Sequence, residues 1–460
     1  MKTPKIALVS LGCTKNLVDS EKILGRLAQG GAVFCQEPEV ADVLIINTCG
    51  FIKEAKEESV ETILQMARLK EAHLKKLIVT GCLAERYKEE LTRDIPEIDH
   101  VVGLENFDLV AELSGLKEEK NVRHDEPAAD LGCQGDFRIR LTPRHYSYLK
   151  ISEGCNNPCS YCSIPIIRGP FRSRAMEEVL REARELVSGG TKEINLIAQD
   201  STIYGIDLYG RQCLHELLQR LSAIDNLKWI RLLYTHPAHF YPALIKEVAD
   251  NEKVVKYIDL PIQHINDKIL EMMGRGVSSA NIAGLIKRLR QKIPGLFLRS
   301  TVIVGFPGEG EEEFQELLNF LEENAFERLG AFKYSKEEGT SAAKLKGHVS
   351  EKTKKQRLEK VMSLQQELAF KENARWVGKE IEVLIEGVGA IRPRRTVAQN
   401  NGAGTRPAPT LQWGYGRFYG DAPEVDGDVK LKGLNLKVGE LRRALVTGWE
   451  GYNLVARSVD

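Results

Sequence analysis

Apolar runs alternate with amphipathic stretches along the first 120 residues of the chain. Three runs rich in β-branched and aliphatic residues, KIALVSLGC, ADVLIINTCG and KLIVTGC, are each followed by a stretch of helical periodicity, at residues 16–29, 52–69 and 83–91. Continuous apolar runs that alternate with helical patterns are typical of a parallel sheet with crossover helices. The pattern therefore predicts an α/β domain over residues 1–120, built as a doubly wound parallel sheet.

A second alternation begins after a polar, proline-containing stretch at residues 121–144, which we interpret as a linker. Helix-like segments, for example 177–188 and 311–324, separate six apolar runs, which occupy residues 146–152, 193–200, 229–237, 254–264, 296–309 and 328–335. Six strand–helix units are too few for a complete eight-unit barrel. The pattern predicts a partial, open (β/α)6 barrel over residues 145–374, closed by a long charged amphipathic stretch.

The pattern changes again over residues 375–460, where short strand-like runs are interrupted by frequent glycine. This is typical of a small antiparallel β-barrel. One stretch of this region, residues 390–417, is rich in proline, glycine and asparagine and reads as a loop or disordered arm. The sequence assigns no role to this arm.

The amino-acid composition excludes several classes of protein. Lys plus Arg number 65 and Asp plus Glu number 65, so no overall positive field attracts nucleic acid. No apolar run reaches the roughly 18 residues needed to span a bilayer. Near the N-terminus, IALVSLGC superficially resembles a lipoprotein processing site, but its apolar pattern fits a first β-strand equally well. We therefore expect a cytoplasmic protein, whose nine cysteines indicate metal or redox chemistry more than a disulfide scaffold.

Each of the first three apolar runs ends in a cysteine that follows a small or polar residue. These cysteines are Cys13, Cys49 and Cys82. The pattern puts them at the carboxyl ends of three parallel strands, the edge at which open α/β sheets bind ligands. Three thiols that are far apart in the sequence are thus predicted to share one crevice.

A second set of thiols, Cys155, Cys159 and Cys162, lies within the short stretch EGCNNPCSYCSIP. Three thiolates make a poor structural zinc site, which normally has four ligands, whereas iron–sulfur clusters take thiolates at such loop spacings. A 4Fe-4S cluster held by three cysteines leaves one iron open to a chelating small molecule. The alternatives are a zinc knuckle that borrows a distant histidine, or three unrelated buried thiols.

The form Cys-x3-Cys-x-aromatic-Cys of CNNPCSYC resembles that of radical S-adenosylmethionine (SAM) enzymes. In that superfamily the open iron chelates SAM, and reduction splits SAM to a 5′-deoxyadenosyl radical. With three upstream cysteines and a terminal barrel, the chain is similar to the methylthiotransferase family, whose barrel is called the TRAM domain. The resemblance implies a second 4Fe-4S cluster on Cys13, Cys49 and Cys82. It also implies that SAM serves twice, as methyl donor and as radical source.

Three stretches, SLGCTKNLVDSE, RGPFRSR and YGDAPEVDG, are similar to the RimO branch of that family. This branch modifies the β-carbon of an aspartate of small-subunit ribosomal protein twelve, giving 3-methylthioaspartate. The tRNA-modifying branch, MiaB, usually has Gln-Met-Asn where this chain has Thr14, Lys15 and Asn16, and RimO most often has proline at the position of Thr14. The acidic segment DAPEVDGD suits a basic protein better than a phosphate backbone. The alternatives are a tRNA adenosine methylthiotransferase and a non-enzymatic two-cluster electron carrier.

Further residues are candidates for contact with SAM or substrate. Tyr161 lies inside the cysteine loop, and the other candidates end strands that face the cofactor, namely Gln199, Asp200, Val304 and Gly305. Ordinary packing accounts for each of these residues as well. The arginines of RGPFRSR either bind the ribosomal substrate or are solvated. Beyond the six cysteine ligands we predict no catalytic side chain.

Cys35, Cys133 and Cys213 fit neither set, and we interpret them as ordinary thiols. The resemblance also implies an electron donor such as flavodoxin or ferredoxin, a sulfur source, and a monomeric enzyme that acts on its ribosomal protein, alone or within the assembled subunit.

Overall fold

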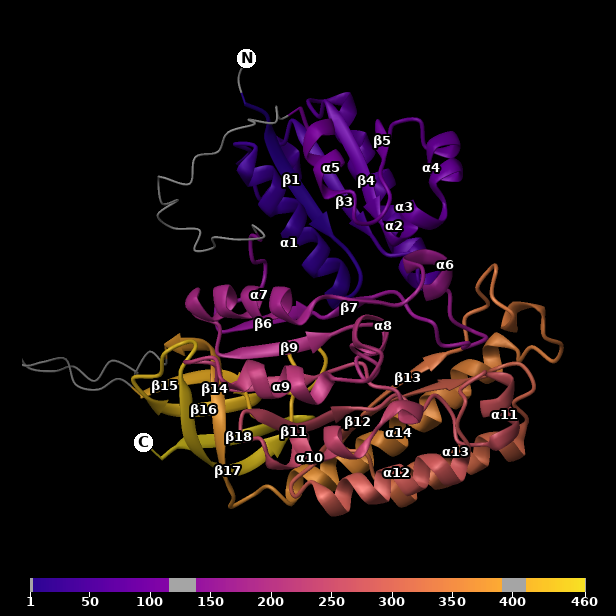
Figure 1. Cartoon of the computed structure of the whole chain (residues 1–460), viewed down its shortest axis with the longest axis vertical. Helices are drawn as coiled ribbons and strands as arrows, with labels where there is room; N and C mark the ends of the chain where they lie inside the picture. Colours follow the sequence, from indigo (N-terminus) through magenta and orange to yellow (C-terminus); the bar gives the residue numbers. More distant parts are fainter. Residues whose placement is uncertain (1–2, 116–137, 391–410, 460) are drawn as a thin grey trace, which may run out of the picture.

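The computed structural model describes residues 3–115, 138–390 and 411–459 (Figure 1). The N-terminal sheet stands above the carboxyl edge of a larger central sheet, and the C-terminal barrel lies beside that central sheet. No helix within these described ranges is long and apolar enough to cross a membrane. Cys133 and most of the stretch interpreted as a linker lie outside the described residues.

The N-terminal sheet has five parallel strands in the order β2-β1-β3-β4-β5. The strands are β1 (Lys5–Ser10), β2 (Val33–Phe34), β3 (Val43–Thr48), β4 (Lys76–Gly81) and β5 (His100–Val101). The helices are α1 (Thr14–Gln29), α2 (Lys53–Ala67), α3 (Cys82–Arg86), α4 (Lys88–Asp94) and α5 (Phe107–Leu113), with short 3-10 turns η1 (Pro38–Val40) and η2 (Arg68–Glu71).

The side chains of β3 show why this sheet is covered on both faces. Val43 and Ile45 pack with α1 and α5, whereas Leu44 and Ile46 pack with α2 and α3. Successive side chains of a strand point to opposite faces, so a strand buried on both sides reads as one continuous apolar run. The doubly wound arrangement expected from the sequence is confirmed.

The central sheet contains six parallel strands in the order β13-β12-β11-β10-β9-β6. They are β6 (Tyr146–Lys150), β9 (Glu193–Ile197), β10 (Trp229–Leu232), β11 (Val254–Asp259), β12 (Phe297–Val304) and β13 (Arg328–Lys333). A short antiparallel hairpin, β7 (Ser152–Glu153) with β8 (Arg172–Ser173), follows β6. All six strands match the apolar runs of the sequence, and the sheet is the expected open, partial barrel.

One face of this sheet packs against helices to form the largest apolar core. The main helices are α7 (Met176–Ser188), α9 (Leu214–Ser222), α10 (Pro242–Asp250), α12 (Ser279–Lys292), α13 (Glu311–Asn324) and α14 (Glu351–Ala374). Shorter ones are α6 (Ile164–Arg168), α8 (Ile206–Tyr209), α11 (Asp267–Met272), η3 (Pro237–His239) and η4 (Ala342–Lys344). The opposite face of the sheet packs against the C-terminal barrel.

The C-terminal barrel is closed in the order β14-β15-β16-β18-β17. Its strands are β14 (Glu380–Ala390), β15 (Leu411–Arg417), β16 (Val429–Leu434), β17 (Leu441–Glu450) and β18 (Asn453–Ser458). All neighbouring pairs are antiparallel except β16 with β18, which is parallel. The predicted antiparallel barrel therefore contains one parallel pair.

Strand β15 corrects the interpretation of residues 390–417 as a loop. Residues 411–417 pair with both β14 and β16, so they form a strand of the barrel. Two glycines that made this stretch look like a loop instead allow close strand contacts: a Cβ on Gly416 would lie 2.2 Å from Leu384 O, and one on Gly414 would lie 2.9 Å from Gly387 O. Residues 391–410 lie outside the described part of the chain.

The acidic segment of the barrel faces the central sheet. Asp421 is buried and pairs with Arg328, while Tyr257 donates a hydrogen bond from its hydroxyl to Asp426 Oδ2 at 2.6 Å. Arg299 also lies within 3.6 Å of the Asp426 carboxylate. These two acidic charges therefore fix the barrel to the sheet, and they no longer support the argument that the segment suits a basic partner.

A buried group of four charges joins the N-terminal domain to the central sheet. Lys150 Nζ lies 2.5 Å from Asp19 Oδ1 and 2.6 Å from Glu153 Oε2, and Arg168 contacts the same two carboxylates at 3.2 and 3.0 Å. Lys150 and Arg168 hold the pKa of Glu153 well below its usual range although burial opposes this. Since Asp19 belongs to α1 and the other three residues to the central domain, these ion pairs fix how the two domains meet.

Arg138 forms a second bridge at the end of the stretch interpreted as a linker. Its guanidinium pairs with Glu21 of α1 and lies 2.7 Å from Glu182 of α7, and it donates to the Tyr148 carbonyl at 2.8 Å. Burial of all three charged groups means that the last part of this stretch is an integral part of the domain interface.

The pairing of β14 with β15 predicts that residues 391–410 can be removed. Ala390 lies opposite Gln412, so Asn-Gly in place of 391–410, together with Leu411, would connect the strands by a three-residue hairpin turn. Replacing 391–410 by Asn-Gly should change the free energy of unfolding by no more than about 2 kcal/mol, because loop-closure entropy varies slowly with length. Denaturant unfolding measures this. As a control, deleting 411–417 as well should unfold the barrel; unfolding by the shorter deletion alone would contradict the prediction.

The buried charge group predicts a large effect at Arg168 and a small one nearby. Arg168→Met leaves two buried carboxylates with one cation, and should lower the free energy of unfolding by about 3 kcal/mol. Arg172→Met is the matched control, because the Arg172 side chain is 51% exposed and, among the described residues, forms an ion pair with exposed Glu105 alone; it should cost less than about 0.5 kcal/mol. Equal denaturant midpoints for the two variants would show that the ion pairs do not hold the interface.

Candidate metal and cofactor site

The three upstream thiols follow three neighbouring strands. Cys13 follows β1 and precedes α1, Cys49 follows β3, and Cys82 begins α3 directly after β4. Since β1, β3 and β4 are adjacent and parallel, their carboxyl ends lie side by side. Cys13 and Cys49 both act electrostatically on the Cys82 thiol. The structure thus brings these three predicted ligands together.

Two glycines permit this close approach. A Cβ on Gly12 would lie 2.7 Å from Cys49 Cβ and 3.0 Å from its sulfur, and Gly12 has a φ of +87°. A Cβ on Gly50 would lie 2.9 Å from the backbone of Cys82. Only glycine fits where one backbone passes so close to another group, so SLGC and TCG carry the local geometry as well as the sulfur atoms.

Asn16 and Arg168 complete the surroundings of the upstream thiols. The Asn16 side-chain amide donates to Leu11 O at 3.1 Å and to Thr48 O at 2.8 Å, which ties the loops after β1 and β3 together. Its Oδ1 accepts from Arg168 at 2.6 Å and from the Cys82 thiol at 3.4 Å. Arg168 also donates to Cys82 Sγ at 3.4 Å. A residue of the central domain therefore reaches the upstream thiols directly.

Burial controls the charge of these thiols. It raises the pKa of Cys82 to about 12 and also raises the pKa of Cys49, and the positive charge of Arg168 opposes both shifts. In the absence of a metal these two thiols are neutral. A metal that binds here has to displace their protons, and Arg168 then compensates part of the thiolate charge.

The downstream thiols lie on a loop that is held to the barrel at several points. Cys155 N donates to Gly169 O at 3.2 Å, and Cys162 N donates to Cys159 O at 3.1 Å. Ser160 donates hydrogen bonds to the carbonyls of Met272 and Met273 at the end of α11, at 2.7 and 2.9 Å. These contacts fix the loop conformation before any ligand binds.

Burial also raises the pKa values of thiols in the downstream set. Burial raises the pKa of Cys155 to about 11 and that of Cys162 to about 12. Arg275, which is 5% exposed, donates to Cys159 Sγ at 3.5 Å and pairs with no carboxylate among the residues described. Each thiol set therefore has one buried arginine at hydrogen-bond distance from a sulfur.

Gln199 and Asp200, at the end of β9, lie beside this loop. Gln199 donates to Glu153 Oε1 at 2.7 Å. Asp200 accepts from the Asn157 amide of the cysteine loop at 2.9 Å and contacts His239 Nδ1 at 2.7 Å. The structure brings these two predicted residues to the cysteine loop.

Tyr161, Val304 and Gly305 are placed differently. Tyr161 packs on the apolar cluster that contains Phe306, and its hydroxyl accepts from Arg275 at 3.4 Å. Val304 is fully buried in the main core, and a Cβ on Gly305 would lie 2.3 Å from Lys354 Cγ. Packing accounts for these three positions, and their contact with SAM stays a prediction.

A histidine pair that the sequence analysis did not single out follows β10. The rings of His236 and His239 stack at 4.7 Å, and with Asp200 their ligand atoms lie within 4.8 Å of one another. However, His236 Nδ1 accepts from Ala238 N at 3.2 Å, so its Nε2 carries the proton. Burial and Arg275 lower the pKa of His236 to about 3, so the ring is neutral. It offers a hydrogen-bond donor here and no lone pair for a metal.

Several buried polar atoms near the carboxyl edge of the central sheet lack a partner within the described ranges. They are Ser152 Oγ, Gln199 Oε1, His236 Nε2, Gln263 Oε1 and Arg275 Nε. A buried polar atom that is left unpaired is costly. Both donors and acceptors are present, as a zwitterionic cofactor such as SAM requires. Together with two sets of three thiols, these residues fit iron–sulfur clusters and SAM.

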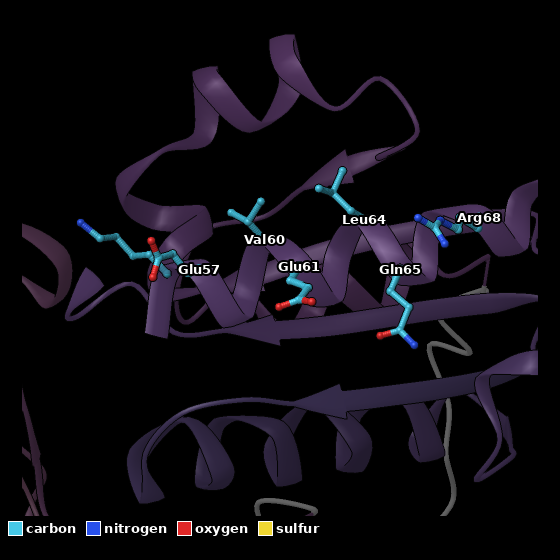
Figure 2. A pocket seen from close by; sticks show the side chains of 7 residues that line it. Glu57, Val60, Glu61, Leu64, Gln65 and Arg68 are labelled. Atoms are coloured by element: carbon cyan, nitrogen blue, oxygen red, sulfur yellow. The ribbon is translucent and has the colours of Figure 1, made fainter. Parts of the chain in front are cut away.

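Two hollows differ in their relation to this site. One is lined by residues of both domains, including Glu85, Glu153 and Arg168, and so opens at the domain interface; none of the six thiols lines it. The other runs along the outer face of α2, where Leu64 and Arg68 line a shallow groove that contains none of the six thiols (Figure 2). The first therefore adjoins Arg168 and Glu153, which join the two domains, whereas the second lies on the outside of the N-terminal domain.

The remaining predicted positions are accounted for by packing. Cys213 is buried in the main core and Cys35 is half-buried. Of the arginines in RGPFRSR, Arg174 pairs with Glu182 and Arg172 alone is exposed. Both sequence alternatives for Arg168 were wrong: it is buried, and its partners Asp19 and Cys82 lie far away in the chain.

Comparisons with known proteins agree with this architecture. Residues 5–103 match the uncharacterized protein family UPF0004, residues 149–321 match the radical SAM superfamily, and residues 410–459 match the TRAM domain. Among solved structures, the radical SAM methyltransferase TsrM from Kitasatospora setae, with cobalamin and a 4Fe-4S cluster bound, has a TM-score of 0.52 at 15% identity, covering 72% of each chain. At this identity the likeness shows the fold alone.

Curated relatives are similar over nearly the whole chain. The ribosomal protein uS12 methylthiotransferase RimO of Thermoanaerobacter sp. (strain X514) is 46% identical over 452 residues, which cover 98% of this chain and 99% of the relative. That of Geobacter sulfurreducens is 45% identical over 466 residues, 99% of each. The family expected from the motifs is confirmed: the chain belongs to the RimO family of radical SAM methylthiotransferases.

Proposed function

We propose that this protein transfers a methylthio group to the β-carbon of an aspartate of ribosomal protein uS12, with SAM and two 4Fe-4S clusters. The main support for this proposal is that six thiols form two sets of three at the carboxyl ends of the strands of two parallel sheets. The names of the full-length relatives support the uS12 substrate. SAM and an iron–sulfur cluster follow from the radical SAM family.

The assignment of ligands follows the two sets. Cys155, Cys159 and Cys162 would hold one cluster, and Cys13, Cys49 and Cys82 would hold the other. When bound, the clusters and SAM supply the methyl group, the sulfur site and the radical chemistry that replaces hydrogen on a carbon without an acidic proton. Three thiols per cluster leave one iron of each open to a further ligand.

The chain itself prepares the site. Arg168 and Arg275 donate to one sulfur of each set and offset part of the thiolate charge. Gln199, Asp200 and neutral His236 line the polar edge of the central sheet, where they would hold SAM. Tyr161, Val304 and Gly305 stay candidates for weaker contacts through packing or backbone. Burial of these groups excludes water from the radical step.

The rival functions differ in what they require. A tRNA adenosine methylthiotransferase would use the same thiols, but the relatives aligned over the whole chain are named for the ribosomal protein. A two-cluster electron carrier has no use for unpaired polar atoms at the strand ends. The partners remain proposals: an electron donor such as flavodoxin or ferredoxin, a sulfur source, and action as a cytoplasmic monomer on free or assembled uS12.

Iron content tests the two-cluster assignment. Anaerobically reconstituted protein should hold about eight irons, and alanine at all three cysteines of either set should leave about four. Triple substitution of the upstream set should preserve SAM cleavage and abolish methylthiolation, because the sets have separate tasks. Full iron content after triple substitution of the downstream set would refute the radical SAM assignment. Cys213→Ala is the control and should leave iron unchanged.

Mass spectrometry tests the substrate. With this protein, one aspartate of uS12 should gain a methylthio group in place of a hydrogen, and uS12 incubated with the variant that lacks the upstream cysteines should not. Unmodified uS12 together with newly methylthiolated tRNA would transfer the assignment to the tRNA branch.

A further inference from the structure

Lys15 is a buried cation without an anionic partner. Its side chain lies at the start of α1, two residues after Cys13, and the residue is 7% exposed. The ammonium group lies 3.0 Å from the centroid of the Tyr234 ring, and no carboxylate of the described residues pairs with it. An aromatic ring compensates only part of the cost of burying a charge.

Of the buried cations described for this site, Lys15 and Arg275 lack a carboxylate partner, but Arg275 donates to Cys159 Sγ whereas Lys15 contacts only the ring of Tyr234 among the described residues. Lys150, Arg168 and Arg138 are each paired with two carboxylates. Their charges are therefore satisfied within the fold. The charge of Lys15 is not, and a buried unpaired charge near a reactive site indicates a ligand of opposite charge.

The place of Tyr234 puts this cation between the two thiol sets. Tyr234 follows β10 at the carboxyl edge of the central sheet, and its carbonyl accepts from Ser201 N at 2.8 Å, next to Asp200. Its hydroxyl pairs with Thr14 Oγ1 at 3.2 Å. Lys15 therefore lies where the loop after Cys13 meets the polar strand ends that would hold SAM.

We propose that Lys15 binds the side-chain carboxylate of the substrate aspartate, which makes it a positioning and specificity residue. This inference rests on the proposed function. The carboxyl carbon of aspartate is bonded directly to the β-carbon, so an ion pair with Lys15 would fix the carbon that reacts. Tyr234 would hold the ammonium in place, and adenosine, which has no carboxylate, could not form the pair.

A double-mutant cycle on the holoenzyme tests the pair. We would measure Kd for two uS12 peptides, with aspartate or asparagine at the target position, on wild type, Lys15→Met and Lys15→Gln. Wild type should prefer the aspartate peptide by about tenfold or more, as for a charge-assisted contact. Both variants should bind the two peptides equally. Lys53→Met, at an exposed lysine of α2, should keep the wild-type preference.

Two outcomes would overturn the inference. One is a preference for aspartate that survives in both Lys15 variants while wild type modifies uS12. The other is loss of about four irons in both variants, which would assign Lys15 to the upstream cluster and away from substrate. Failure of the proposed function itself is distinguishable, because wild type would then bind neither uS12 peptide and modify no uS12.

Discussion

The burial of the Arg168 guanidinium between two domains is the constraint on which the site depends. The guanidinium contacts a sulfur of the upstream set, Asn16 in the first turn of α1, and the two carboxylates Asp19 and Glu153. Glu153 in turn stands two residues before Cys155. One side chain therefore links the ligand loops of both thiol sets.

The energetics of this arrangement explain its rigidity. Two buried cations face two buried carboxylates, so the group is neutral as a whole, and the loss of any member leaves a charge that water cannot reach. Such groups do not add much stability compared with apolar packing, but they tolerate only one geometry. That property suits an interface that holds two sets of thiols in a fixed relative position.

The C-terminal barrel is attached by the same kind of contact. Glu193 of β9, fully buried, pairs with Arg231 of β10 and with Arg417 of β15, and Arg231 donates to the Tyr419 carbonyl at 2.7 Å. The barrel thereby covers the face of the central sheet that its own helices leave open. The acidic segment DAPEVDGD, which the sequence suggested as a surface for a basic partner, in part attaches the barrel to the central sheet.

Most of the helices and strands and both sets of thiols could be predicted from the sequence, because each depends on a local pattern of residues. Apolar runs predicted most of the strands, cysteines at the ends of three of these runs predicted the upstream set, and the close spacing within EGCNNPCSYCSIP predicted the downstream set. Arg168, His236 and Lys15 could not be assigned from the sequence, because their roles arise from contacts with residues far away in the chain. Strand β15 was missed because Gly414 and Gly416, which allow close strand contacts, look like loop residues when read alone.

The central claim is that the two thiol sets hold separate clusters that the buried interface brings close together. Electron paramagnetic resonance of the reduced, reconstituted protein tests it most directly, with the two triple-cysteine variants as references for the single clusters. The account predicts a wild-type spectrum that is broadened by magnetic interaction between two clusters. A wild-type spectrum equal to the sum of the two single-cluster spectra, or identical to one of them, would contradict it.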